Sequence, residues 1–129
     1  MKINDLKNSS SRNIHFVKKD IPDLKLSLPE ILIMEGSIYN IVTEDELFNI
    51  IAQFMNFPSY FGKNWDALSD CLKDMQWAPA KGYVLILRDS VDAWSKNPYM
   101  WGIFIEVWMA VSEFWRDFDI PFHLIFLME

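Results

Sequence analysis

The stretch on which the fold depends runs from residue 58 to residue 72. It reads Pro58-Ser59-Tyr60-Phe61-Gly62-Lys63-Asn64-Trp65-Asp66-Ala67-Leu68-Ser69-Asp70-Cys71-Leu72. Two aromatic residues precede Gly62, which closes a turn. Asn64 is a good helix N-cap residue, because its side-chain oxygen can accept a backbone N–H of the first turn. We therefore predict a helix over about residues 65–75.

The predicted helix has an apolar side and an acidic side when its residues are spaced at about 100° each. The apolar side, expected to face the core, comprises Trp65, Leu68, Cys71, Leu72 and Met75. Asp66 and Asp70 lie one turn apart on the opposite side, where their repulsion costs a few tenths of a kcal/mol in an isolated helix. The pair either lies on an ordinary solvated surface or belongs to a binding surface. The nearby Tyr60 favours the second, because aromatic side chains often anchor interfaces.

Length and composition indicate one globular domain. The chain has 129 residues, of which 51% are hydrophobic and 16% aromatic, so it can bury a substantial core. It has one cysteine and no signal-like beginning, which favours a reducing cytoplasm. The longest apolar run, residues 98–111, is too short to span a bilayer and contains Glu106.

Charge is distributed unevenly along the chain. Residues 1–30 have six Lys/Arg and four Asp/Glu, a net charge of +2, whereas residues 31–129 have six and fourteen, a net of −8. The total is −6. A domain this acidic lacks the cationic surface that nucleic-acid binding requires. It is instead suited to a basic protein partner.

The N-terminal part is predicted to differ from the rest. We expect residues 1–29 to form a partly flexible extension and residues 30–129 to form the domain. The polar residues 1–12 predict a mobile end, and residues 21–28 predict a linker. Residues 13–17 either form a short strand of their own or lie along the domain. Within them, His15 is expected to point to solvent and is weak evidence for a metal site.

The domain itself is expected to contain three buried strands with helices between them. Apolar runs predict strands over residues 30–34, 83–87 and 122–127, the first buried on both faces and ended by Gly36. A capping box with Thr43 as N-cap and Glu46 predicts a helix that ends by Pro58. A longer helix is expected to begin near Pro98.

Helical connections between strands imply a parallel sheet. We therefore predict an α/β fold, a single domain with a three-stranded parallel sheet and helices packed on it. Four tryptophans are expected to pack in the core rather than to hold a cofactor: Trp94, Trp101, Trp108 and Trp115. His123, in the last strand, is expected to be a hydrogen-bonded core or edge histidine and not a catalytic base.

The opening stretch resembles the signature of the barstar family, intracellular inhibitors of barnase-type ribonucleases. That pattern is roughly Pro-x-aromatic-aromatic-Gly-x-Asn-x-Asp-Ala-Leu-x-Asp-Cys-Leu. The resemblance extends over about residues 30–129 and implies a barstar-like architecture that agrees with the predicted strand and helix order. Two positions differ, since Ser69 stands where the family can have tryptophan and Trp65 where it can have leucine.

The resemblance also implies a partner-binding surface. Its candidate residues are Tyr60, Gly62, Asn64, Trp65, Asp66, Ser69, Asp70 and Glu113. Tyr60 would pack into the partner's cleft, Asn64 would hydrogen-bond at its rim, and Asp66 and Asp70 would pair with its cations. Glu113 is the candidate for a third acidic contact. The resemblance implies no catalytic residue, metal or cofactor.

Three functions are compatible with this reading. The first is a cytoplasmic immunity protein or antitoxin that binds a barnase-type or other ribonuclease toxin 1:1 and occludes its active site. The second is a regulatory module that binds a basic partner other than a nuclease. The third is an enzyme that uses Asp66 and Asp70 as a carboxylate pair, which we disfavour. Glycosidase carboxylates flank a pocket at about 5–9.5 Å, whereas these two share one exposed helical face.

Overall fold

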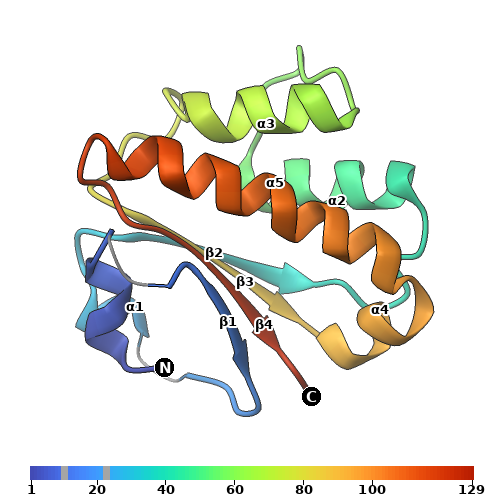
Figure 1. Cartoon of the computed structure of the whole chain (residues 1–129), viewed down its shortest axis with the longest axis horizontal. Coiled ribbons are helices and arrows are strands. Elements are labelled where there is room, and N and C mark those ends of the chain that lie inside the picture. The colour runs from blue at the N-terminus through green and yellow to red at the C-terminus, as the bar shows by residue number, and fades with distance from the viewer. Residues whose placement is uncertain (10–11, 22–23) are drawn as a thin grey trace.

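The structure is a computed structural model, which describes residues 1–9, 12–21 and 24–129. Its elements are η1 (Ile3–Lys7), β1 (Ile14–Val17), α1 (Leu24–Ser27), β2 (Leu32–Ser37), α2 (Glu44–Met55), α3 (Trp65–Asp74), β3 (Tyr83–Arg88), α4 (Ser90–Lys96), α5 (Pro98–Arg116) and β4 (Phe122–Leu127). The strands form one parallel sheet in the order β1-β4-β3-β2 (Figure 1). The predicted α/β class with a parallel sheet is confirmed.

The prediction of three strands is wrong, because the sheet has a fourth strand, β1. It pairs with β4 in parallel, with Ile14 opposite Leu124 and Val17 opposite Leu127. All six residues of β4 are buried, as expected for a central strand with neighbours on both sides. A run of four residues is too short for its periodicity to distinguish a strand from an extended segment.

The first predicted strand is shifted and more exposed than expected. β2 spans Leu32–Ser37, and it is an edge strand in which Glu35 is exposed. We predicted that Gly36 would end this strand, but Gly36 lies within it. A Cβ atom at Gly36 would lie 2.0 Å from a ring carbon of Phe54, so the glycine allows α2 to pack closely on the sheet.

The helices agree closely with the sequence. Both bonds of the predicted capping box are present at the start of α2, which ends at Met55, before Pro58. α5 begins at Pro98 as predicted, and a separate helix, α4, precedes it. Trp101 and Trp108 are fully buried, and Trp94 and Trp115 pack against the same core. The prediction that the tryptophans belong to the core is confirmed.

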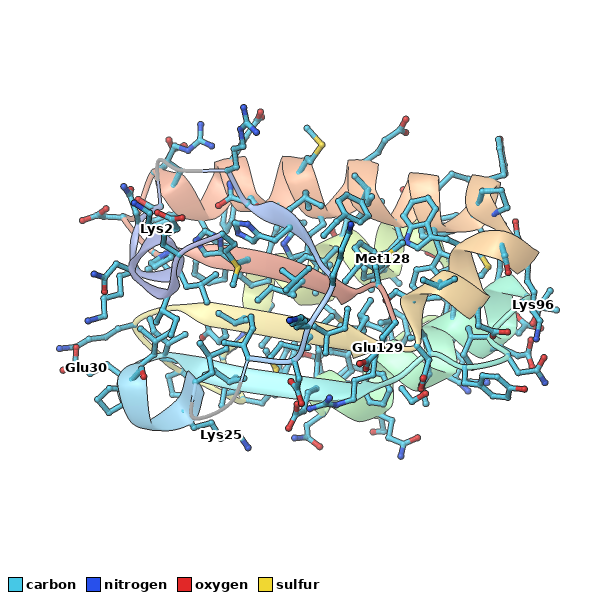
Figure 2. All side chains as sticks on the ribbon, turned by 90° about the horizontal axis from the view of Figure 1, so that it is seen from below. Lys2, Lys25, Glu30, Lys96, Met128 and Glu129 are labelled. Atoms are coloured by element: carbon cyan, nitrogen blue, oxygen red, sulfur yellow. The ribbon has the colours of Figure 1, made fainter. Side chains whose placement is uncertain are left out.

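Each face of the sheet is covered by different elements. Helices α2, α4 and α5 cover one face, where the larger core cluster lies, and α3 lies over α2 and α5 on the same side (Figure 1). The opposite face is packed by Leu6, Leu24 and Leu28 from the N-terminal part of the chain. Figure 2 shows that η1 and α1 lie at the end of this second face marked by Lys2 and Lys25. The predicted linker over residues 21–28 therefore contains a helical turn, with Leu24 and Leu28 buried against the sheet. Residues 22–23 of this linker lie outside the described part.

A histidine pair joins β1 to β4 on this second face. Nε2 of His15 lies 2.9 Å from Nδ1 of His123, and Nε2 of His123 lies 3.1 Å from the carbonyl oxygen of Asn8. Because the carbonyl can only accept, His123 donates from Nε2 and accepts at Nδ1 from His15. The prediction that His15 points to solvent is therefore wrong. The prediction that His123 is a hydrogen-bonded buried histidine is confirmed.

This pair predicts a loss of stability in mild acid. Burial, and then the proximity of His15, lowers the pKa of folded His123 from 6.5 to about 4, so the unfolded chain binds the proton first. The stabilisation is complete above about pH 6.5 and is lost as the pH falls toward about 4. At pH 5 we expect unfolding to require roughly 2 kcal/mol less than at pH 7, at about 1.4 kcal/mol per pH unit below 6.5.

Urea unfolding at the two pH values measures this loss. Variant His123→Asn serves as the control, because it lacks the titrating ring, and most of the pH difference should disappear in it. A difference in the parent protein that His123→Asn leaves unchanged would contradict the assignment.

Candidate functional site: the acidic face of α3

The start of α3 is fixed by its cap. Oδ1 of Asn64 accepts a hydrogen bond from the backbone N–H of Ala67 at 2.8 Å, as predicted for an N-cap. The preceding residue, Lys63, has φ of +52°, in the left-handed region, which turns the loop sharply into the helix. Gly62 is exposed in this loop, and its carbonyl accepts a bond from Nδ2 of Asn64 at 3.4 Å.

The inner side of α3 is anchored to the domain. Leu68, Cys71 and Leu72 are buried, as the helical spacing predicted. Trp65 is partly buried and packs edge-on against Phe48, with ring centroids 4.9 Å apart. Nε1 of Trp115 in α5 donates to the carbonyl of Leu72 at 2.9 Å. These contacts hold the backbone of α3 in place, so its outer side chains project from a fixed support.

The outer side of α3 is acidic, as predicted. Asp66 and Asp70 are exposed, and Asp74 continues the same row one turn further along. Tyr60 is 67% exposed, and its hydroxyl donates to Oδ2 of Asp74 at 3.2 Å. We call Tyr60, Asp66, Asp70 and Asp74 the acidic face.

Tyr60, in the loop before α3, and Cys71, within the helix, keep their protons. Desolvation, and then the bond to Asp74, raises the pKa of Tyr60, so its hydroxyl remains a neutral donor. Burial and the charges of Asp74 and Asp70 raise the pKa of the Cys71 thiol. Because the thiolate is the reactive form, Cys71 has the character of a core residue.

The comparison with known protein families agrees with this geometry. The model of one family, described as Barstar (barnase inhibitor), matches residues 32–127. The chain belongs to the barstar family. No curated protein matches the chain. The match begins close to the predicted domain boundary at residue 30, and it includes β2, β3, β4 and every helix from α2 onward.

The family match covers three of the four strands and the helices that pack on one side of the sheet. Membership makes the chain a relative of ribonuclease inhibitors. β1, η1 and α1 all lie before the matched residues.

Within the described ranges, no cluster of three potential metal-binding side chains occurs. No described helix combines the length and hydropathy of a membrane span.

The structure does not bring every candidate residue of the family surface together. Ser69 is partly buried beside the acidic face, and Trp65 is turned toward Phe48. Glu113 is exposed on α5, in the wall of a groove formed with β1. By contrast, α3 packs on α5 through the bond from Trp115 to Leu72. A contact between Glu113 and the same partner stays a prediction.

One link of the acidic face was not predicted from the sequence. The bond from Tyr60 to Asp74 joins residues fourteen positions apart. The sequence shows Asp74 only as a flanking acid of the helix. Its position eight residues after Asp66 would have placed Asp74 on the same row. That spacing gives no indication of the bond between Asp74 and Tyr60 in the loop.

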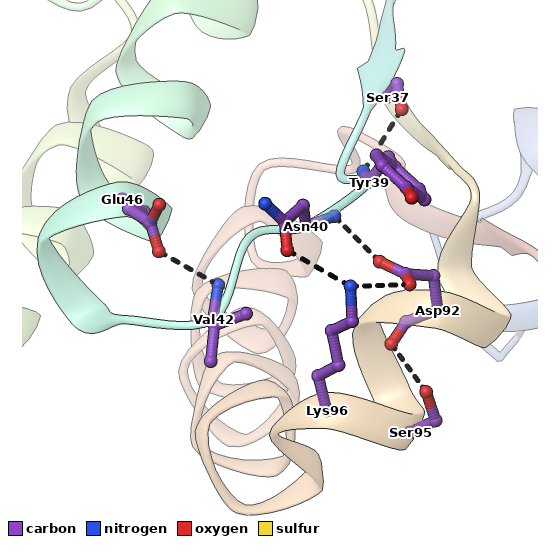
Figure 3. Close-up of polar contacts among 8 residues, drawn as sticks. All are labelled: Ser37, Tyr39, Asn40, Val42, Glu46, Asp92, Ser95 and Lys96. Atoms are coloured by element: carbon purple, nitrogen blue, oxygen red, sulfur yellow. Dashed lines mark hydrogen bonds and ion pairs between the residues drawn. The ribbon is translucent and has the colours of Figure 1, made fainter.

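A second polar cluster lies at the carboxyl ends of β2 and β3, where α/β sheets often bind ligands. Figure 3 shows that its groups bond to one another. Asp92 accepts from the backbone N–H of Asn40 at 2.7 Å and pairs with Lys96 at 2.9 Å. Lys96 also donates to Oδ1 of Asn40 at 3.0 Å and lies over the ring of Tyr39. This cluster joins the loop after β2 to α4 and is a structural link.

Replacing Asp92 with asparagine is expected to lower the melting temperature at neutral pH. The N–H of Asn40, and then Lys96, lowers the pKa of Asp92. Its contribution is therefore present above the ordinary carboxyl pKa and is lost as the pH falls through the lowered value. The difference in melting temperature between parent and Asp92→Asn should shrink in strong acid. Glu106→Gln, at an exposed position of α5, is the matched control and should melt like the parent.

Proposed function

We propose that this chain is an intracellular inhibitor that binds a ribonuclease 1:1 and occludes its cationic active site with the acidic face of α3. It would act as an immunity protein or antitoxin in the cytoplasm of the cell that makes the nuclease. The observation that carries the proposal is the row of exposed carboxylates on a helix whose other side is anchored. Membership of a family of barnase inhibitors supports it.

The chemistry is that of a phosphate mimic. A ribonuclease active site holds RNA phosphates with arginine and lysine side chains. Asp66 and Asp70, one helical turn apart, present two negative charges to such a site without a bond that the enzyme can cleave. Because α3 is anchored through Leu72 and Trp115, little backbone entropy would be lost when the carboxylates are bound.

Charge and aromatic contacts would have different parts in this binding. The net charge of −6 speeds the encounter with a basic partner and makes the association rate depend on salt. Tyr60 offers a large exposed ring with a neutral hydroxyl, the kind of residue that often dominates binding energy. Although Tyr60 precedes α3 in the sequence, its hydroxyl reaches Asp74 at the carboxyl end of the acidic face.

An inhibition assay tests the proposal. A purified barnase-type ribonuclease cleaves a fluorogenic RNA while the chain is titrated in, at about 50 mM and about 500 mM NaCl. We expect complete inhibition at one equivalent and a much slower association at the higher salt concentration, where charges are screened beyond about 4–5 Å. Absence of inhibition at a large excess, with the family's own barnase inhibitor active in parallel, would exclude this class of target.

The position of Ser69 favours one alternative, a basic partner that is not a nuclease. Ser69 stands where the family can have tryptophan, and Trp65 is turned inward against Phe48. The acidic face therefore has Tyr60 as its exposed aromatic side chain, which suits a partner of different shape. Binding of a basic partner through Asp66 and Asp70 that blocks no ribonuclease would favour this alternative.

A further inference from the structure

Within the described parts of the chain, the backbone groups on the outer edge of β1 have no hydrogen-bond partner. The carbonyls of Asn13 and Val17 accept bonds from Leu124 and Met128, so the odd-numbered residues of this segment face β4. Because backbone groups alternate in direction along a parallel strand, those of Ile14 and Phe16 point away from the sheet. β1 is the last strand on its side of the sheet, as Figure 1 shows. An added strand could pair at these two residues.

Hollows lie beside this edge on both faces of the sheet. On the helical face, a hollow of about 390 Å³ lies between β1 and α5, and its walls include Ile14, Phe16, Ile105 and Met109. Phe16 and Met109 are 55% and 52% exposed, which is unusual for two large apolar side chains in one groove.

On the other face, a hollow of about 360 Å³ is lined by Asp5 and His15 together with Ile14, Phe16 and Arg12. The two hollows share Arg12, Ile14 and Phe16. The side chains of an extended peptide point alternately to the two faces. A strand added to β1 would therefore place apolar side chains toward α5 and polar ones toward Asp5 and His15.

The charges beside this edge differ from those of the whole molecule. Arg12 and Arg116 both lie at the groove, and Lys18 and Lys19 follow directly after β1. Glu113 lies in the same wall, Asp5 lines the second hollow, and Asp20 follows Lys19. An otherwise acidic protein thus has four cationic side chains against three acidic ones at the border of this strand. An incoming strand with carboxylate side chains fits this border better than a basic one.

The same charges disfavour a second copy of this chain as the occupant. In an antiparallel pair of β1 strands, Ile14 would pair with Phe16 of the other copy, with the twofold axis at His15. This register places Arg12 opposite Lys18 twice. Like charges directly opposite each other destabilise a strand pair. These charges therefore disfavour self-pairing in this register, and the oligomeric state of the chain tests the others.

We propose that the open edge of β1 binds an extended segment of a partner protein by strand addition, with apolar residues directed into the β1–α5 groove and acidic residues on the opposite face, beside Arg12. Such pairing takes its affinity from backbone hydrogen bonds and its selectivity from the alternating side chains. The edge belongs to residues that precede the family match, together with the flank of α5. It is separate from the acidic face of α3.

A defined peptide tests the proposal. The probe is a labelled peptide of alternating valine and glutamate, and its comparison peptides replace glutamate with lysine or methylate alternate backbone nitrogens. Fluorescence anisotropy measures binding to the full chain, and NMR follows the amide signals of Ile14 and Phe16. We expect the acidic peptide to bind at least about tenfold more tightly than either comparison peptide and to shift both amide signals.

Matched variants locate the contact. Met109→Glu places a carboxylate in the groove, and Arg12→Glu reverses the charge at the edge. Each should weaken binding of the acidic peptide at least about tenfold. Tyr99→Glu, at a position that is 80% exposed and not part of the groove wall, should leave binding unchanged. Circular dichroism verifies that all three variants are folded.

Three results would overturn the proposal. One is equal binding of the acidic and basic peptides. The second is unchanged binding in both Met109→Glu and Arg12→Glu. The third is a dimer in solution that Met109→Glu dissociates, which would assign the edge to a second copy.

Discussion

Replacing Asp70 with alanine is expected to weaken the complex with the target ribonuclease by about 2–5 kcal/mol, or roughly 30-fold to several thousandfold. This is the general cost of truncating one member of a buried charge pair, and close charge pairs at the barnase–barstar interface itself couple by about 1.5–7 kcal/mol. The cost is large because the cation on the partner would remain buried without its carboxylate. Most of the loss should appear as faster dissociation, since the substitution would remove a hydrogen-bonded charge pair from the proposed interface.

The free protein should respond to Asp70→Ala in the opposite direction. Asp70 is exposed and follows Asp66 by four residues, so its removal relieves a like-charge repulsion on α3. We expect the variant to be as stable as the parent or slightly more stable. Function, rather than folding, would then account for two carboxylates at this spacing.

Surface plasmon resonance or stopped-flow mixing with the target nuclease measures the effect, and urea unfolding measures the stability of the free variant. Glu106→Gln is the matched control, because it removes an exposed negative charge from α5 and leaves the acidic face intact. It should alter the association rate slightly and the dissociation rate hardly at all. An affinity of Asp70→Ala within twofold of the parent would show that the acidic face is not the binding surface.

The acidic face could be predicted because its determinants are local. An asparagine cap, the 100° spacing and the apolar partners of α3 are all contained in residues 64–75, and the structure agrees with each of them. The bond from Trp115 to Leu72 could not be predicted, since it joins residues 43 positions apart. The position of Glu113 likewise depends on how α5 is rotated against the sheet, and a periodic pattern fixes that rotation only approximately.

The N-terminal part was harder to predict because its structure depends on distant partners. Four residues of β1 have little strand signal by themselves, and they are ordered by pairing with β4, more than 100 positions away. His15 alternates with the apolar Ile14 and Phe16. On a sheet with one face open to solvent, this pattern would expose His15. That face is instead covered by η1, and His15 finds His123 there. In both cases tertiary contacts override the local pattern.

Replacing Trp108 with alanine should produce the largest loss of stability, about 3–5 kcal/mol. Its ring is fully buried and stacks on Phe122 with centroids 4.5 Å apart, and its Nε1 donates to the carbonyl of Phe122 at 3.2 Å. The substitution would leave a cavity between α5 and β4 and remove one donor, although Ser112 also donates to this carbonyl at 2.9 Å. Since a domain of this size is stable by about 5–15 kcal/mol, the variant should remain folded in water but unfold at much lower urea.

Urea titration followed by circular dichroism measures this loss, with Trp108→Phe as the graded control that keeps a stacked ring and should cost distinctly less. A loss below about 1 kcal/mol in Trp108→Ala would contradict the assignment of this ring to the core. Where Trp108→Ala is folded, its affinity for the nuclease should equal that of the parent, because the acidic face contains no part of this ring. Asp70→Ala should show the reverse, intact stability with lost affinity. Opposite responses in the two variants would separate recognition on α3 from the packing that supports it, whereas parallel losses would mean that Asp70 acts through the fold.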